Sequence, residues 1–175
     1  MKLIKIVVFL LLVSLTSLLD AQQSLVYAHS NADFKRAKEL FVAKKYVAAQ
    51  RKFKQVFDRV EEPHSEVKMN AEYFIALCAL ELFNPDAEHL LVEFIEANPQ
   101  SPKVPKAKFQ LGQFNYRKKR WTPSIKWFEQ VDENNLELSE VPEYYFKYGY
   151  SLFRKKKSSE AQKLFHKSKS MVSDY

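Results

Sequence analysis

The stretch FQLGQFNYRKKRWTPSIKWFEQV, residues 109–131, decides the fold of this chain. Apolar residues recur at helical spacing on both sides of the basic run RKKR, which predicts two short amphipathic helices joined by a turn. The stretch holds Gly112, one of only two glycines in the protein. The other, Gly149, follows 37 residues later (149 − 112) in a segment of the same kind. This interval indicates a chain built from repeated helical hairpins.

Helical spacing extends on both sides of this stretch, from Asn31 towards the C-terminus, and no alternating strand pattern interrupts it. We therefore expect an all-α chain of eight helices, paired in hairpins over residues 31–63, 66–99, 102–135 and 141–173. Capping residues and first-turn prolines predict where helices begin. These signals are Ser65, Asn84-Pro85-Asp86, Ser101-Pro102, Thr122-Pro123, Pro142 and Ser158.

Small residues recur at fixed intervals when the hairpins are aligned. In the first helices they are Ala37, Ala76, Gly112 and Gly149, at intervals of 39, 36 and 37 (76 − 37, 112 − 76, 149 − 112). In the second helices they are Ala49, Ala87, Ser124 and Ala161, at intervals of 38, 37 and 37 (87 − 49, 124 − 87, 161 − 124). Four positions after these come large residues: Phe53, Leu91, Phe128 and Phe165. Small residues let helices approach closely and the large ones fill the adjacent gap, so all twelve are predicted to pack the repeats.

On these residues the chain resembles the tetratricopeptide-repeat family over Asn31 to Val172. The matching positions are Leu111-Gly112, Ser124 and Ala161, the later aromatics Phe128 and Phe165, and Tyr46 and Trp121 before the second helices. The second hairpin departs from the pattern, because Pro85 replaces the aromatic and Ala76 the glycine. The resemblance implies a right-handed superhelical solenoid of about four repeats that binds other proteins and is not an enzyme.

The junction NPQSPKVPKAKFQLG, residues 98–112, looks closest to periplasmic and outer-membrane-associated members of that family, of the assembly-lipoprotein and cell-division-coordinator type. Carried over by position, the family's concave face of first helices implies seven partner-binding residues here. They are Lys38, Asn70, Lys106, Gln113, Arg117, Tyr150 and Arg154. The neighbouring aromatics, among them Phe109 and Phe146, are interpreted as packing residues.

The N-terminus has the pattern of a secretory signal peptide over residues 1–21. Lys2 and Lys5 precede an apolar run over residues 6–19, and Ala21 offers a cleavage site. An uncleaved anchor and a buried core helix are the alternatives. We expect a linker over residues 22–30, a repeat domain over residues 31–175, and a location in the periplasm or on the periplasmic side of the outer membrane. No cysteine follows the apolar run, so no lipid attachment is expected there.

The formal net charge is +7, or +6 without the predicted signal peptide (removing Lys2, Lys5 and Asp20). A net positive charge can indicate a protein that binds nucleic acid. The predicted export argues against this and favours acidic proteins or anionic envelope surfaces as partners. Peripheral membrane association therefore stays open. Cys78 is the only cysteine, which excludes an internal disulfide, and its apolar surroundings predict a buried, inert thiol.

Signals of catalysis are weak in this sequence. The four histidines are scattered without ligand spacing, and neither glycine lies in a phosphate-binding loop. The acidic pairs Glu61-Glu62 and Asp132-Glu133 are interpreted as solvated loop charges. We therefore predict no cofactor, no metal, no small-molecule substrate and no enzymatic activity.

Basic runs recur in the turns between the two helices of a hairpin, and we call them the basic edge. They are Lys44-Lys45, Arg117-Lys118-Lys119-Arg120 and Arg154-Lys155-Lys156-Lys157, the last two 37 residues apart (154 − 117). One interpretation is that these cations stabilise helix C-termini and keep the turns soluble. The other is a docking site for an acidic partner or an anionic envelope polymer.

The last hairpin leaves two questions open. The tyrosines at positions 144, 145, 148 and 150 are interpreted either as a contact surface, since interfaces favour tyrosine, or as cover for an adjoining repeat. The C-terminus lacks the polar capping helix that terminal repeats normally need. Either the array continues in a longer parent chain, or Met171, Val172 and Tyr175 cover the end.

Overall fold

The computed structural model describes residues 28–63 and 65–173, and these residues are all-helical. They form eight α-helices and one short 3-10 helix, without a strand, which confirms the all-α prediction. No helix in the described ranges is both long and apolar enough to cross a membrane. The predicted signal peptide, most of the predicted linker, and Tyr175 lie outside the described residues.

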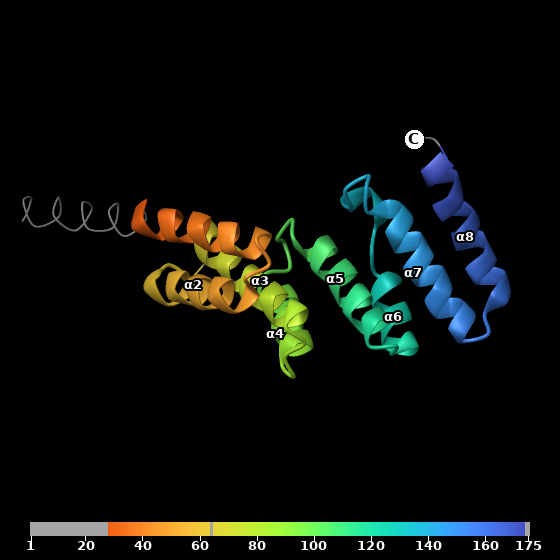
Figure 1. Cartoon of the computed structure of the whole chain (residues 1–175), viewed down its shortest axis with the longest axis horizontal. Helices are drawn as coiled ribbons and strands as arrows, with labels where there is room; N and C mark the ends of the chain where they lie inside the picture. Colours follow the sequence, from red (N-terminus) through yellow and green to blue (C-terminus); the bar gives the residue numbers. More distant parts are fainter. Residues whose placement is uncertain (1–27, 64, 174–175) are drawn as a thin grey trace, which may run out of the picture. The chain divides into compact units, whose positions relative to one another are not determined.

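The chain divides into two compact units, which meet between Cys78 and Ala79. The first unit contains a helix over residues 28–42, then α2 (Tyr46–Arg59) and most of α3 (Glu66–Glu81) (Figure 1). Aromatic rings fill its core, where Phe53 stacks on Phe74 with ring centroids 5.0 Å apart. Cys78 is fully buried in the same core, as expected.

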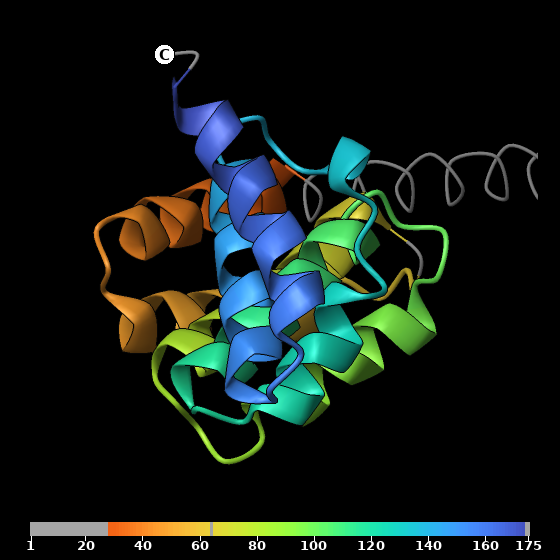
Figure 2. The same cartoon turned by 90° about the vertical axis from the view of Figure 1, so that its right-hand side faces the viewer.

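The second unit contains two antiparallel hairpins that lie side by side (Figures 1 and 2). The helices of this unit are α4 (Ala87–Ala97), α5 (Val104–Arg117), α6 (Trp121–Phe128), α7 (Val141–Arg154) and α8 (Ser158–Ser173), and a 3-10 helix, η1 (Glu133–Asn135), precedes α7. Helix α7 packs on both α5 and α6, because the Tyr144 ring contacts Phe109 and Phe128. The Tyr144 hydroxyl also donates a hydrogen bond to the Phe128 carbonyl oxygen (3.2 Å).

One turn geometry recurs four times, at the end of each helix that opens a hairpin. A left-handed residue follows the helix at Lys44, Phe83, Lys119 and Lys156, with φ of 57°, 56°, 57° and 63°. The next residue then donates its N–H to a carbonyl five positions back, as Arg120 does to Asn115 (2.9 Å). This is the Schellman closure, which satisfies the last carbonyls of a helix. Each left-handed residue lies seven positions after a predicted small residue (44 − 37, 83 − 76, 119 − 112, 156 − 149).

The residues predicted to pack the repeats are buried, with one exception. The buried set comprises Ala37, Ala49, Phe53, Ala76, Ala87, Leu91, Gly112, Ser124, Phe128, Gly149 and Ala161. Phe165 is only half-buried. At Gly112 an added Cβ would overlap the Phe128 ring, so glycine is required there by helix contact. The Ser124 hydroxyl strengthens this contact by donating to the Gly112 carbonyl oxygen (3.0 Å).

Several helix starts differ from the sequence prediction. Helix α4 begins at Ala87, and Pro85 lies in the turn that precedes it. Helix α6 begins at Trp121, one residue before Thr122-Pro123. The Schellman closure explains why α6 begins at Trp121, since it places Arg120 at the N-cap position directly after the turn. Helix α5 begins at Val104, and Ser101 precedes it in a turn.

Other starts match the prediction or shift slightly. Ser65 caps α3 by accepting a hydrogen bond from the Lys68 N–H (3.4 Å), and Pro142 lies in the first turn of α7. The first described helix already includes residue 28, within the expected linker.

Candidate binding face

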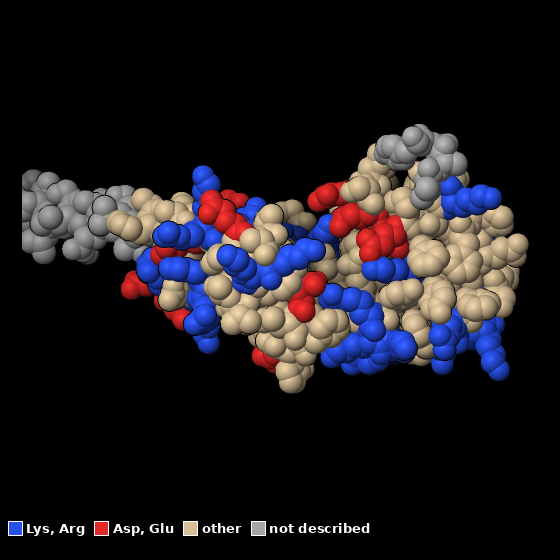
Figure 3. All heavy atoms as spheres, in the orientation of Figure 1, with Lys and Arg blue, Asp and Glu red and all other residues tan. Residues whose placement is uncertain are grey.

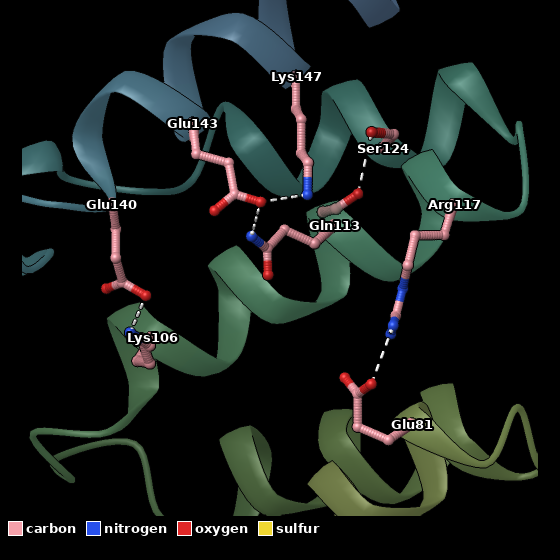
Figure 4. A network of polar contacts seen from close by, with 9 residues as sticks. Glu81, Lys106, Gln113, Arg117, Ser124, Glu140, Glu143 and Lys147 are labelled. Carbon is pink, nitrogen blue, oxygen red and sulfur yellow. Dashed lines mark hydrogen bonds and ion pairs between the residues drawn. The ribbon is translucent and has the colours of Figure 1, made fainter. Parts of the chain in front are cut away.

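Three polar side chains lie along α5 and each contacts a carboxylate from a neighbouring helix or its preceding loop (Figure 4). We call Lys106, Gln113 and Arg117 the α5 row. Lys106 Nζ pairs with Glu140, Gln113 Nε2 donates to Glu143 Oε1 (2.9 Å), and Arg117 Nη1 donates to Glu81 Oε2 (3.2 Å). The three partners are acids, so the α5 row is a set of donors suited to carboxylates.

The Gln113 and Arg117 contacts are exposed enough to be exchanged, whereas the Lys106–Glu140 pair is less exposed, at 27% and 18%. The side chains of Arg117 and Glu81 are each 31% exposed, and such ion pairs contribute only about 0–1 kcal/mol. Lys147 competes for the same acid as Gln113, because its ammonium also pairs with Glu143. An external carboxylate could therefore replace an internal one at little cost in stability.

Two further predicted residues of this face, Tyr150 and Arg154, lie in an aromatic cluster at the end of α7. The Tyr150 ring contacts Tyr116 and Trp121, in both cases with centroids 5.7 Å apart. The Arg154 guanidinium carbon lies 4.9 Å from the Trp121 ring centroid, a cation–π contact. Arg154 is therefore held by rings rather than by an acid.

The other two predicted binding residues, Lys38 and Asn70, belong to the first unit. Lys38 Nζ lies 5.7 Å from the Phe74 ring centroid, and Asn70 Nδ2 donates to Glu66 Oε1 (3.5 Å). Neither contact resembles the carboxylate contacts of the α5 row, since Asn70 meets an acid on its own helix. Of the seven predicted residues, the second unit holds five.

The basic edge of the second unit lies at the α5–α6 and α7–α8 turns, where Lys and Arg gather along the lower rim in Figure 3. Several of these cations already have partners. Lys118 lies over the Phe114 ring, Arg120 pairs with Glu88 (2.5 Å), and Lys157 pairs with Glu160 (3.6 Å).

In the basic edge of the second unit, Lys119, Lys155 and Lys156 make neither an ion pair nor a cation–π contact within the described part of the chain. All three are exposed. Lys44 and Lys45 occupy the matching turn of the first unit and are also exposed. In the second unit, Lys119, Lys155 and Lys156 are therefore the cations of the basic edge that a partner could bind without breaking an internal contact.

A buried polar contact near α5 was not predicted. Asn115 is fully buried, and its Nδ2 donates to the Leu111 carbonyl oxygen and to Glu88 Oε1, both at 2.9 Å. Burial alone would raise the pKa of Glu88, but hydrogen bonds from Asn115 and Arg120 outweigh it and lower the pKa. This contact ties α4 to α5 beneath the basic edge.

Sequence reasoning also missed the acids that contact the α5 row. They are Glu81, Glu140 and Glu143, which lie 36, 34 and 30 positions from their partners. The separations of 36 and 34 are close to the repeat interval, so a search for donors and acids about one repeat apart would have found Glu81 and Glu140.

Within the described residues no group of three or more His, Cys, Asp or Glu could hold a metal ion. A comparison of the chain with protein-family models and with curated proteins found no match.

Proposed function

We propose that this chain is a non-catalytic scaffold for protein–protein interactions that binds an acidic segment of its partner along the α5 row. The observation that carries the proposal is that Lys106, Gln113 and Arg117 each contact a carboxylate from another part of the second unit. Side chains that select internal acids in this way can select those of a partner by the same contacts.

The proposed architecture is a right-handed superhelical solenoid of four tetratricopeptide-like repeats. The recurring left-handed residue supports it, since its intervals of 39, 36 and 37 (83 − 44, 119 − 83, 156 − 119) equal those of the small residues. Stacked repeats present their first helices as one extended surface, which is how such arrays bind partners.

The proposed location is the periplasm or the periplasmic side of the outer membrane, with cell-envelope proteins as partners. The signal-peptide pattern of residues 1–21 supports this. The mass of the protein isolated from its native cells tests it. A chain that begins at Gln22 is expected, and an intact Met1 in soluble cytoplasmic protein would contradict export.

Photo-crosslinking tests the binding face. A photoreactive residue placed at Gln113 is expected to capture a partner from an envelope extract, whereas the same residue at Lys126, exposed on α6, is not. Capture that is equal at both positions would contradict the proposed face.

The second candidate function is binding of an anionic envelope polymer to the basic edge. The unpaired, exposed Lys119, Lys155 and Lys156 favour it, because their charge is available without breaking an internal contact. The triple change of these lysines to Gln would then abolish polymer binding, and binding would weaken steeply with salt. Replacing Arg117 is a poorer test, since it also breaks the contact with Glu81.

A further inference from the structure

The turn before α2 carries exposed apolar and basic side chains together. Val42 and Val47 are 77% and 56% exposed, although both are apolar. Between them lie Lys44 and Lys45, which are exposed and make neither an ion pair nor a cation–π contact within the described part of the chain. We call residues 42–47 the first-unit tip.

The first-unit tip has a defined conformation. The Lys45 N–H donates to the Leu40 carbonyl oxygen (2.9 Å) as part of the Schellman closure. The rings of Phe41 and Tyr46 contact each other, with centroids 5.4 Å apart, and both pack against the core of the first unit. The core of this unit therefore already uses the neighbouring aromatic residues, and it leaves the two valines of the tip unburied.

Charge is unevenly distributed along the first unit. Residues 28–57, which include the tip, contain eight Lys or Arg and two acidic residues, a net charge of +6 (8 − 2). Residues 58–78 contain two basic and five acidic residues, a net charge of −3 (2 − 5). Within the described residues, Lys52 is the one cation of residues 28–57 that forms an ion pair, with Asp33 (3.7 Å). The tip thus lies in a strongly basic segment whose charge is mostly not neutralised internally, and such a segment attracts anionic surfaces.

The α5–α6 turn provides a comparison within the same protein. It also carries an exposed lysine, Lys119, but none of its described residues is a large exposed apolar one. Cations alone suit any anionic molecule, including a soluble polymer, which offers no apolar surface to a valine. An anionic bilayer offers lipid phosphates for lysines and acyl chains for apolar side chains, so it complements both features of the tip.

We infer that the first-unit tip contacts the surface of an anionic lipid membrane. Val42 and Val47 enter the boundary between headgroups and acyl chains, while Lys44 and Lys45 face the lipid phosphates. Peripheral contacts of this kind depend on buried apolar area together with attraction to anionic lipid. The tip belongs to the first unit and lies outside the α5 row, so the inference goes beyond the proposed function and can fail separately from it.

Fluorescence quenching at the tip tests this inference. A bimane label is attached to the full chain through Val42→Cys, and Cys78 does not compete for the label because it is buried. The probe is a vesicle of equal parts phosphatidylglycerol and phosphatidylcholine, brominated near the carboxyl end of the acyl chains. We expect the vesicles to reduce the emission at least about twofold, since a label at the headgroup boundary lies within reach of the bromines. Quenching reports the position of the label alone, so binding of the apolar residues 6–19 to the vesicle does not imitate it.

Matched labels separate the tip from general attraction to the vesicle. The same label is attached through Glu62→Cys, at an exposed position of the acidic segment of the first unit, or through Lys119→Cys. Both are expected to show no quenching. Vesicles of phosphatidylcholine alone are expected to leave the label at residue 42 unquenched, because they carry no net charge.

Two variants of the labelled chain separate the apolar and the basic contributions. The double change Lys44→Gln and Lys45→Gln is expected to abolish the quenching at residue 42, and Val47→Ser is expected to reduce it without changing the net charge. The three replaced residues are exposed, so a thermal melt is expected to show that both variants remain folded.

Three results would overturn the inference. They are no quenching at residue 42, equal quenching at the control positions, and quenching that Val47→Ser leaves unchanged. Binding of polyphosphate that requires Lys44 and Lys45, without quenching by the vesicles, would also overturn it and assign the tip to a soluble anionic polymer.

Discussion

Gly112 and Gly149 occupy equivalent positions but differ in the space around them. A Cβ at Gly112 would overlap the buried Phe128 ring, whereas at Gly149 the nearest atom is 3.1 Å away, on the half-buried Phe165. The sequence intervals predicted the role of both glycines. They could not predict this difference, because it depends on whether another helix covers the facing phenylalanine.

The first prediction concerns these two glycines. Gly112→Ala should lower the free energy of unfolding by roughly 1–3 kcal/mol through overpacking. Gly149→Ala should cost less, since Phe165 can move and alanine favours a helix by about 1 kcal/mol over glycine. Chemical denaturation of both variants measures the order, and a Gly149→Ala variant that is the less stable of the two would contradict it.

The second prediction concerns the left-handed residue Lys119. Its φ of 57° strains a residue with a side chain by about 1–2 kcal/mol, and glycine relieves that strain. Lys119→Gly should therefore stabilise the protein by about 0.5–1 kcal/mol after the extra entropy cost of glycine. Lys118→Gly is the matched control, because Lys118 has φ of −78° and should lose stability instead. Equal effects of the two changes on the melting temperature would argue against the left-handed turn.

At the scale of helices, periodicity predicted the elements well and capping signals predicted their starts less well. Pro85 and Pro123 were expected at the first position of a helix, yet Pro85 lies in a turn and Pro123 is the third residue of α6. The turn after the preceding helix decides where α6 begins, and no glycine marks that turn in the sequence. A lysine in the left-handed conformation cannot be recognised from the sequence. The lysines and arginines of these turns were therefore interpreted by their charge alone.

The third prediction concerns the tyrosines by which α7 packs on its neighbours. Burial, assisted by the charges of Glu129 and Glu160, raises the pKa of Tyr148 to about 12. The unfolded chain releases this proton near pH 10, so the stabilisation is complete below pH 10 and is lost as the pH rises towards 12. Unfolding free energies measured across this window should fall less steeply for Tyr148→Phe than for the unchanged chain. Parallel profiles would show that Tyr148 is not protected in the folded state.

At the scale of the molecule, the sequence predicted which cations and polar residues face a possible partner but not what already occupies them. The α5 row emerged from a family resemblance, and its acidic partners come from helices or loops far away in the chain. The basic edge was predicted as a uniform set, whereas all three of its arginines contact an acid or an aromatic ring. Such distinctions require the packing of one hairpin on the next, which spacing alone does not provide.

The internal acids give the most direct test of carboxylate recognition by the α5 row. If Glu81 and Glu143 occupy sites that an acidic partner also uses, neutralising them should strengthen binding of an external acid. We expect Glu81→Gln and Glu143→Gln each to raise the affinity for a labelled decaglutamate peptide by roughly three- to tenfold, or about 0.7–1.4 kcal/mol. Glu160→Gln makes the same change in net charge at the basic edge, where Glu160 pairs with Lys157, and should leave the affinity unchanged.

The affinity of decaglutamate for these three variants is therefore the decisive measurement. Tighter binding by Glu81→Gln and Glu143→Gln alone would support an α5 row that recognises carboxylates. Tighter binding by Glu160→Gln alone would contradict it and place the acid-binding site at the basic edge.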